Sequence, residues 1–184
     1  MKKTICLLLA LFFLLIPLTG CGSSSKKQQE IYEQAIKAID DYEYAKAVSL
    51  LNQIPAYKDS QEKIKEAQNG ELQAKFANYV FNFIKDGSFY NPSAARVLDA
   101  SYEDSDGYYA KNLEADGILY LRIQGTNKFG GTLNKEYVIV IGGEYDGEAF
   151  SNEDSGKNYK LTDEEIDVPT INKMLIKYWA DYGL

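Results

Sequence analysis

The sequence contains no histidine, and the second of its two cysteines, Cys21, is the last one in the chain. These absences exclude Ser-His-Asp and Cys-His catalytic arrangements, together with zinc sites built on histidine or on several cysteines. No intrachain disulfide can form after Cys21, so the fold of that part of the chain must depend on packing alone. We expect neither a metal nor another cofactor.

A long apolar stretch stands at the start of the chain. Lys2 and Lys3 precede fourteen almost purely apolar residues, 5–18. That length is typical of a secretory signal peptide, and it is too short to span about 30 Å of hydrocarbon, which needs about 20 residues.

The stretch ends in Leu18-Thr19-Gly20-Cys21, which resembles the lipobox of bacterial lipoproteins. The resemblance implies cleavage of a signal peptide, 1–20, and a diacylglycerol on the Cys21 sulfur. We therefore expect anchoring to the cell membrane, on its extracytoplasmic face, through a flexible lipidated tether at 21–29. The alternatives are an ordinary secretory signal with an incidental cysteine, and a retained transmembrane helix.

Negative charge is concentrated in the C-terminal half. The net charge is −7, and residues 87–184 carry 17 acidic and 9 basic side chains, against 10 and 9 in residues 22–86. An acidic domain argues against nucleic acid as a partner and against lying flat on anionic lipid. It is compatible with a cationic partner and with plain solubility.

Helical periodicity covers residues 30–86. Two segments, 32–39 and 44–51, each place Tyr, Ala and branched aliphatic residues on one face. Asp41 is a plausible N-cap for the second helix, and Asp59 for a third helix that follows Pro55.

The segment "YEYAKAVSLL" followed by "YKDS" resembles a tetratricopeptide-type hairpin and its junction, as found in tetratricopeptide-like bacterial lipoproteins. Only one hairpin and one further helix are present, whereas such repeats need about three units to form a concave groove. We therefore expect a stalk or docking element rather than a peptide-binding groove. The third helix continues with an aromatic stripe, which we expect to pack on a C-terminal sheet: Leu72, Phe76, Tyr79, Val80, Phe83 and Ile84.

Residues 87–184 change to the alternation of strands. We predict strands at 94–102, 117–125 and 135–143, a short edge strand near 148, and an amphipathic helix that begins near Pro169. The fold class is therefore α+β: a helical hairpin with a long helix, then a small antiparallel sheet closed by a C-terminal helix. The order of these segments also resembles uncharacterised lipoproteins of Gram-positive bacteria, a likeness that implies no activity.

Two groups of residues merit a functional hypothesis. Glu103, Asp104 and Asp106 could offer oxygens to calcium, although the twelve-residue ligand pattern is missing and a solvated turn is favoured. Five tyrosines near the strands and loops of the acidic domain could stack against a glycan, although tyrosine is also common in half-buried strands: Tyr108, Tyr109, Tyr120, Tyr137 and Tyr145.

No pair of carboxylates stands out as a catalytic pair, so we do not expect an enzyme. The sequence favours a membrane-anchored, non-catalytic protein-interaction or accessory module whose partner is an envelope protein. The alternative is a ligand-binding module for cell-wall glycan or another small molecule. A concave surface lined by Tyr108, Tyr109 and Phe129 would favour that alternative.

Overall fold

The computed structural model describes residues 21–87, 89–151 and 166–184, without the side chains of residues 21–24. The expected signal peptide, 1–20, and the side chain of Cys21 lie outside this description. No helix among the described residues is long and apolar enough to cross a membrane. The chain forms two compact units, Met1–Ala67 and Gln68–Leu184, so the division falls inside the long helix and not at residue 86, where the sequence suggested it.

The first unit contains α2 (Cys21–Asp40), α3 (Tyr44–Leu51) and the start of α4 (Ser60–Asp86). The core of this unit consists of Ala35, Leu51 and Ile64, flanked by Tyr32, Ile39 and Leu50. Helix α2 already begins at Cys21, so residues 21–29, expected to form a flexible tether, are helical.

The cap expected for the second helix is also different. Glu43 occupies the N-cap position of α3 and makes no side-chain capping hydrogen bond. The carboxylate of Asp41 instead accepts a hydrogen bond from Lys37, one turn earlier on α2.

The second unit contains a four-stranded antiparallel sheet in the order β1-β2-β3-β4, which confirms the expected α+β class. Its strands are β1 (Arg96–Asp104), β2 (Gly117–Thr126), β3 (Thr132–Ile141) and β4 (Ala149–Ser151). A 3-10 turn, η2 (Pro92–Ala94), precedes β1. The loop between β2 and β3 has five residues, 127–131, and is shorter than expected because pairing continues to Thr126 and Thr132.

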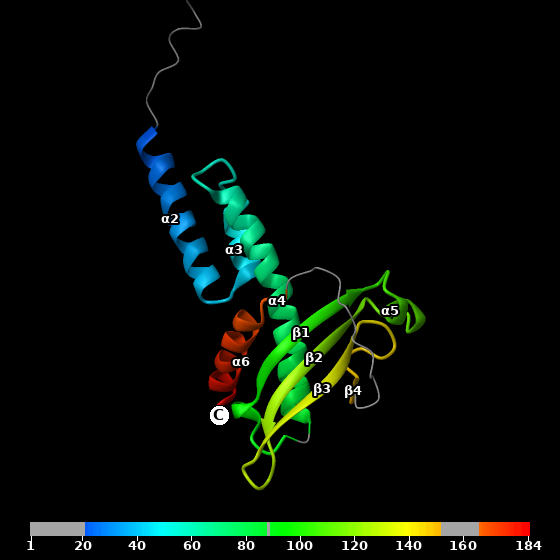
Figure 1. Cartoon of the computed structure of the whole chain (residues 1–184). Coiled ribbons are helices and arrows are strands. Elements are labelled where there is room, and N and C mark those ends of the chain that lie inside the picture. The colour runs from blue at the N-terminus through cyan, green and yellow to red at the C-terminus, as the bar shows by residue number, and fades with distance from the viewer. Residues whose placement is uncertain (1–20, 88, 152–165) are drawn as a thin grey trace, which may run out of the picture. The chain divides into compact units, whose positions relative to one another are not determined.

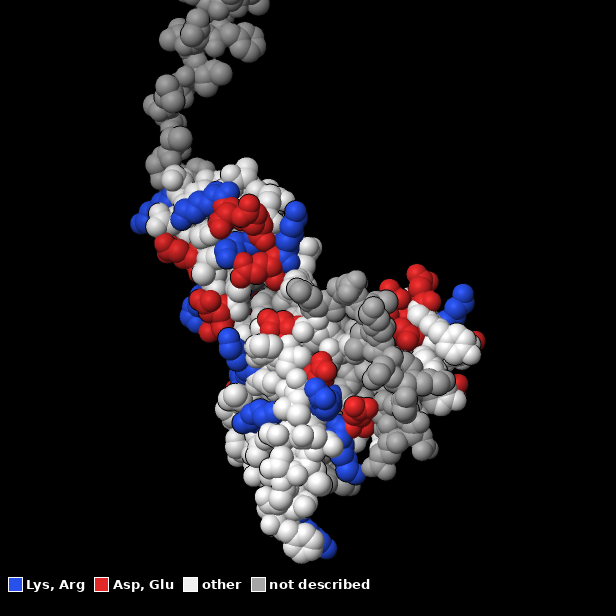
Figure 2. All heavy atoms as spheres, in the orientation of Figure 1, with Lys and Arg blue, Asp and Glu red and all other residues white. Residues whose placement is uncertain are grey.

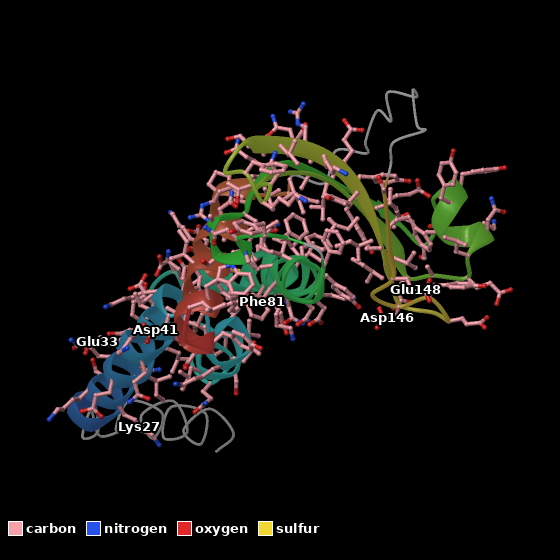
Figure 3. All side chains as sticks on the ribbon, turned by 90° about the horizontal axis from the view of Figure 1, so that it is seen from below. Lys27, Glu33, Asp41, Phe81, Asp146 and Glu148 are labelled. Atoms are coloured by element: carbon pink, nitrogen blue, oxygen red, sulfur yellow. The ribbon has the colours of Figure 1, made fainter. Side chains whose placement is uncertain are left out.

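One face of the sheet is covered by the second part of α4 and by α6 (Val168–Tyr182) (Figure 1). Seen from below, the sheet curves over both helices (Figure 3). The aromatic stripe of α4 contacts the sheet as predicted, because the ring centroids of Phe76 and Tyr102 are 4.9 Å apart and those of Phe83 and Tyr137 are 4.7 Å apart. The buried side of α6 is Ile171, Met174, Leu175 and Trp179.

The opposite face of the sheet carries a short helix, α5 (Tyr108–Asn112), which the sequence did not predict. A second, smaller core lies there: Ala110, Ala115, Ile118 and Val140, with Tyr109, Tyr120 and Val138 packed against it. Further along β2 this face becomes polar, beginning with the exposed Arg122, because alternate residues of a strand point to opposite faces.

Candidate functional site

The three aromatic residues expected to form a ligand site lie at opposite ends of the sheet. Tyr108 and Tyr109 belong to α5, next to the paired residues Asp104 and Gly117, where β1 ends and β2 begins. Phe129 lies in the loop after β2. Ten residues of β2 separate the two ends, which corresponds to about 30 Å. The structure therefore does not bring Phe129 together with the tyrosine pair.

We call the end with α5 the tyrosine end, formed by residues 103–117 and 141–148. Glu103 organises it. Its Oε1 accepts hydrogen bonds from the backbone N–H groups of Tyr109, at 2.6 Å, and Ala110, at 3.1 Å, and its Oε2 accepts one from the Tyr120 hydroxyl at 3.1 Å. Because a carboxylate that accepts several hydrogen bonds is held firmly, Glu103 fixes α5 against the sheet.

Tyr108 projects from this end. Its side chain is 74% exposed, whereas Tyr109 is half-buried beneath it. The two rings meet edge to face, with their centroids 5.1 Å apart. This arrangement presents one free aromatic face on a small protrusion, supported from below by a packed ring.

Two of the three acidic residues proposed for calcium binding, Glu103 and Asp104, have hydrogen-bond partners within the protein. Both oxygens of Glu103 accept the hydrogen bonds described above, and Oδ1 of Asp104 accepts one from the Asp106 backbone N–H at 3.0 Å. Among the residues that the structure describes, no group of three potential metal ligands converges. The geometry is that of a hydrogen-bonded turn leading into α5.

The other end, which we call the hairpin end, is formed by residues 89–95 and 123–135. The Asn127 Oδ1 accepts hydrogen bonds from the backbone N–H groups of Phe129 and Gly131, each at 2.9 Å. Gly130 has φ +80, a conformation that favours glycine, and it completes the tight loop. Phe129 is thereby held at the tip, 85% exposed, with the Nζ of Lys128 5.1 Å from its ring centroid.

More exposed apolar side chains lie behind this tip. The ring of Phe89 lies against Gly125, where a Cβ atom would come within 3.1 Å of it. Leu133 pairs with Gly125 across the strands, so it lies on the same face as that ring. Leu133 and Tyr90 are both exposed. The hairpin end is thus a narrow apolar tip on a well-defined loop.

The "YKDS" segment of the first unit ties α2 to the start of α4. The hydroxyl of Tyr32 donates to Oδ1 of Asp59 at 2.5 Å, and the Nζ of Lys58 lies over the rings of Tyr32 and Tyr57, 4.6 and 5.2 Å from their centroids. The hydrogen bond to Asp59 raises the pKa of Tyr32 to about 12 and lowers the pKa of Asp59. These contacts hold α2 against the start of α4 within the first unit.

A similar pair in the second unit was not found from the sequence. The hydroxyl of Tyr79 on α4 donates to Oδ1 of Asp146 at 2.5 Å, and the same oxygen accepts from the Gly142 backbone N–H at 2.6 Å. Burial and this hydrogen bond raise the pKa of Tyr79 to about 12, and the same bond lowers the pKa of Asp146. Sixty-seven residues separate the partners, so no local pattern signals the contact.

Comparison of the chain with protein-family models, with curated proteins and with solved structures gave no significant match. The functional argument therefore depends on the residues and their geometry.

Proposed function

We propose that this chain is a lipid-anchored, extracytoplasmic interaction module without catalytic activity. The anchor would be a diacylglycerol on Cys21, at the end of the apolar leader. Two acyl chains of this kind hold a protein on a bilayer without a transmembrane helix, because each buried CH₂ contributes about 0.8 kcal/mol. The partner would be another protein of the cell envelope.

The observation that carries the interaction role is the placement of the exposed aromatic residues. Tyr108 and Phe129 project from opposite ends of one sheet, 74% and 85% exposed. A small-molecule site is concave and buries most of its ligand, whereas a side chain on a protrusion becomes buried only against a larger surface. Their positions therefore favour contact with extended surfaces over a glycan fragment held between them.

The anchor can be tested by mass spectrometry of the chain purified from membranes. We expect the mature protein to begin at Cys21 and to carry the added mass of a diacylglycerol. A Cys21→Ser chain should be neither acylated nor retained in the membrane fraction. An unmodified Cys21 in a chain that is still membrane-bound would contradict the proposal.

The interaction can be tested by crosslinking the full chain in its native envelope, with Tyr108→Ser and Phe129→Ser as matched variants from the two ends of the sheet. We expect one defined protein to crosslink to the parent chain and to Phe129→Ser, and we expect Tyr108→Ser to lose it. Enrichment of glycan without a stoichiometric protein would instead support the ligand-binding alternative.

A further inference from the structure

Charge is divided between the two ends of the sheet. The segments of the tyrosine end, 103–117 and 141–148, carry eight carboxylates and a single lysine. The segments of the hairpin end, 89–95 and 123–135, carry two lysines and no carboxylate. In Figure 2 the hairpin end shows white atoms with blue at its extremity, and red gathers around α5. Although the second unit is acidic as a whole, one of its ends is basic and apolar.

The hairpin end also has a defined shape. Asn127 fixes the backbone of Phe129 through two hydrogen bonds to the loop, one of them to Phe129 itself, and Lys128 lies beside the Phe129 ring. Exposed Leu133 lies behind this tip on the strand. An aromatic ring on a preorganised tip loses little conformational entropy when it becomes buried.

From this combination we infer that the hairpin end docks on the anionic surface of a lipid bilayer. Phe129 enters the boundary between headgroups and acyl chains, and Lys128 remains among the anionic headgroups. The eight carboxylates of the tyrosine end are about 30 Å away and are repelled by the same surface, so the unit stands on its hairpin end and does not lie flat. This inference goes beyond the proposed function, and it depends neither on a protein partner nor on acylation of Cys21.

The chemistry favours a bilayer over a protein as the occupant of this tip. A stable protein interface buries about 800 Å² on each partner, which one projecting aromatic residue and its few neighbours cannot supply. Interfacial membrane binding needs only a modest apolar insertion together with attraction of basic residues to anionic lipid. The pairing of Phe129 with Lys128, on two segments that contain no carboxylate, meets that requirement.

The test is depth-dependent fluorescence quenching of the full chain mixed with vesicles of phosphatidylglycerol and phosphatidylcholine. Phe129→Trp reports on the hairpin end, and Tyr108→Trp is the matched control from the tyrosine end. The native Trp179 is only 2% exposed, so lipid should quench it little. Its fluorescence in the parent chain is measured and subtracted as background. We expect lipids brominated on their acyl chains to quench the tryptophan at 129 several-fold more strongly than the tryptophan at 108.

Three further measurements separate docking on an anionic surface from mere proximity to the vesicle. Vesicles of phosphatidylcholine alone should give weaker quenching at 129, and high salt should reduce the signal from the anionic vesicles. Lys128→Gln should lower the apparent affinity of the tip about fivefold, since one lysine near such a surface contributes about that factor.

Equal quenching of the tryptophans at 129 and 108 would overturn the inference. Failure of the chain to bind the anionic vesicles would overturn it as well. Shielding of position 129 only after an envelope protein is added would assign the tip to that protein. Failure to find a protein partner in the crosslinking experiment would leave the quenching result unaffected, so the two proposals fail separately.

Discussion

The side-chain amide of Asn172 on α6 hydrogen-bonds both polar backbone atoms of Val97 on β1. Its Oδ1 accepts from the Val97 N–H at 2.9 Å, and its Nδ2 donates to the Val97 carbonyl at 2.8 Å. β1 is the first strand in the sheet order, and the pairing register shifts between Val97 and Asp99. The amide thus takes the place of a neighbouring strand where the edge is irregular. By occupying these backbone groups, it protects the edge of β1 from pairing with another chain.

Replacing Asn172 should destabilise the second unit. Asn172→Ala leaves the Val97 N–H and carbonyl without these partners, so we expect the free energy of unfolding to fall by about 2–3 kcal/mol in chemical denaturation. Asn172→Asp keeps an acceptor for the N–H but places an oxygen against the Val97 carbonyl, so it should not restore stability. Lys173→Ala, at an exposed position of the same helix, is the control and should change stability little. Equal effects of Asn172→Ala and Lys173→Ala would show that the amide bonds do not matter.

Removing the Glu103 carboxylate should loosen α5. In Glu103→Ala the backbone N–H groups of Tyr109 and Ala110 lose their acceptor, so we expect faster amide exchange at both positions and a loss of about 1–2 kcal/mol. Glu103→Gln retains an acceptor oxygen, so its amide exchange and its stability should lie between those of the parent chain and those of Glu103→Ala. Asp106→Ala serves as the control, because the Asp106 side chain is exposed. Unchanged exchange in Glu103→Ala would contradict this role.

The aromatic stripe of α4 should contribute unequally along its length. Phe76 is 1% exposed and packs on Tyr102, so Phe76→Ala should cost about 3–5 kcal/mol. Phe83 is only partly buried, and its replacement by alanine should cost less than that of Phe76. Phe129→Ala, at an exposed tip, should leave stability within about 0.5 kcal/mol of the parent chain. A loss for Phe76→Ala no larger than that for Phe129→Ala would mean that the stripe is not core.

Tyr32 and Tyr79 should ionise later than an ordinary tyrosine. Hydrogen bonding to Asp59 raises the pKa of Tyr32 to about 12, and burial together with the hydrogen bond to Asp146 raises the pKa of Tyr79 to about 12, against an ordinary value near 10. A raised folded-state pKa means that the stabilisation is complete below about pH 10 and is lost as the pH rises toward 12. Spectrophotometric titration should therefore lose one late-ionising tyrosine in Tyr32→Phe and another in Tyr79→Phe.

The stabilisation contributed by the two aspartates depends on pH in the opposite direction. The pKa values of Asp59 and Asp146 are lowered by the same hydrogen bonds, so their stabilisation is present above the ordinary carboxyl range and is lost as the pH falls through it. Asp146→Asn should flatten the acid limb of the unfolding curve of the second unit and bring the ionisation of Tyr79 closer to pH 10. An unchanged titration of Tyr79 in that variant would contradict the pairing.

Local patterns predicted the elements well where one face of each is buried. The alternation of Leu119, Leu121 and Ile123 indicates β2 directly, and these side chains are buried on the face that packs on the helices. The capping residue of α3 and the helix α5 were missed. Asp41 does not cap α3 because its carboxylate accepts a hydrogen bond from Lys37 instead. Helix α5 depends on Glu103, a residue of β1 whose carboxylate accepts from the N–H groups of α5.

The sequence by itself determined the fold class, because hydrophobic periodicity fixes which face of each helix or strand must be buried. It also determined the chemistry that is excluded, since histidine and later cysteines are missing. Only the tertiary structure decided how the aromatic residues are distributed. Tyr108 and Phe129 are twenty-one positions apart in the chain, yet the antiparallel pairing sends them to opposite ends of one sheet. Strand direction is a property of pairing between distant segments, and it made two separate surfaces out of one expected site.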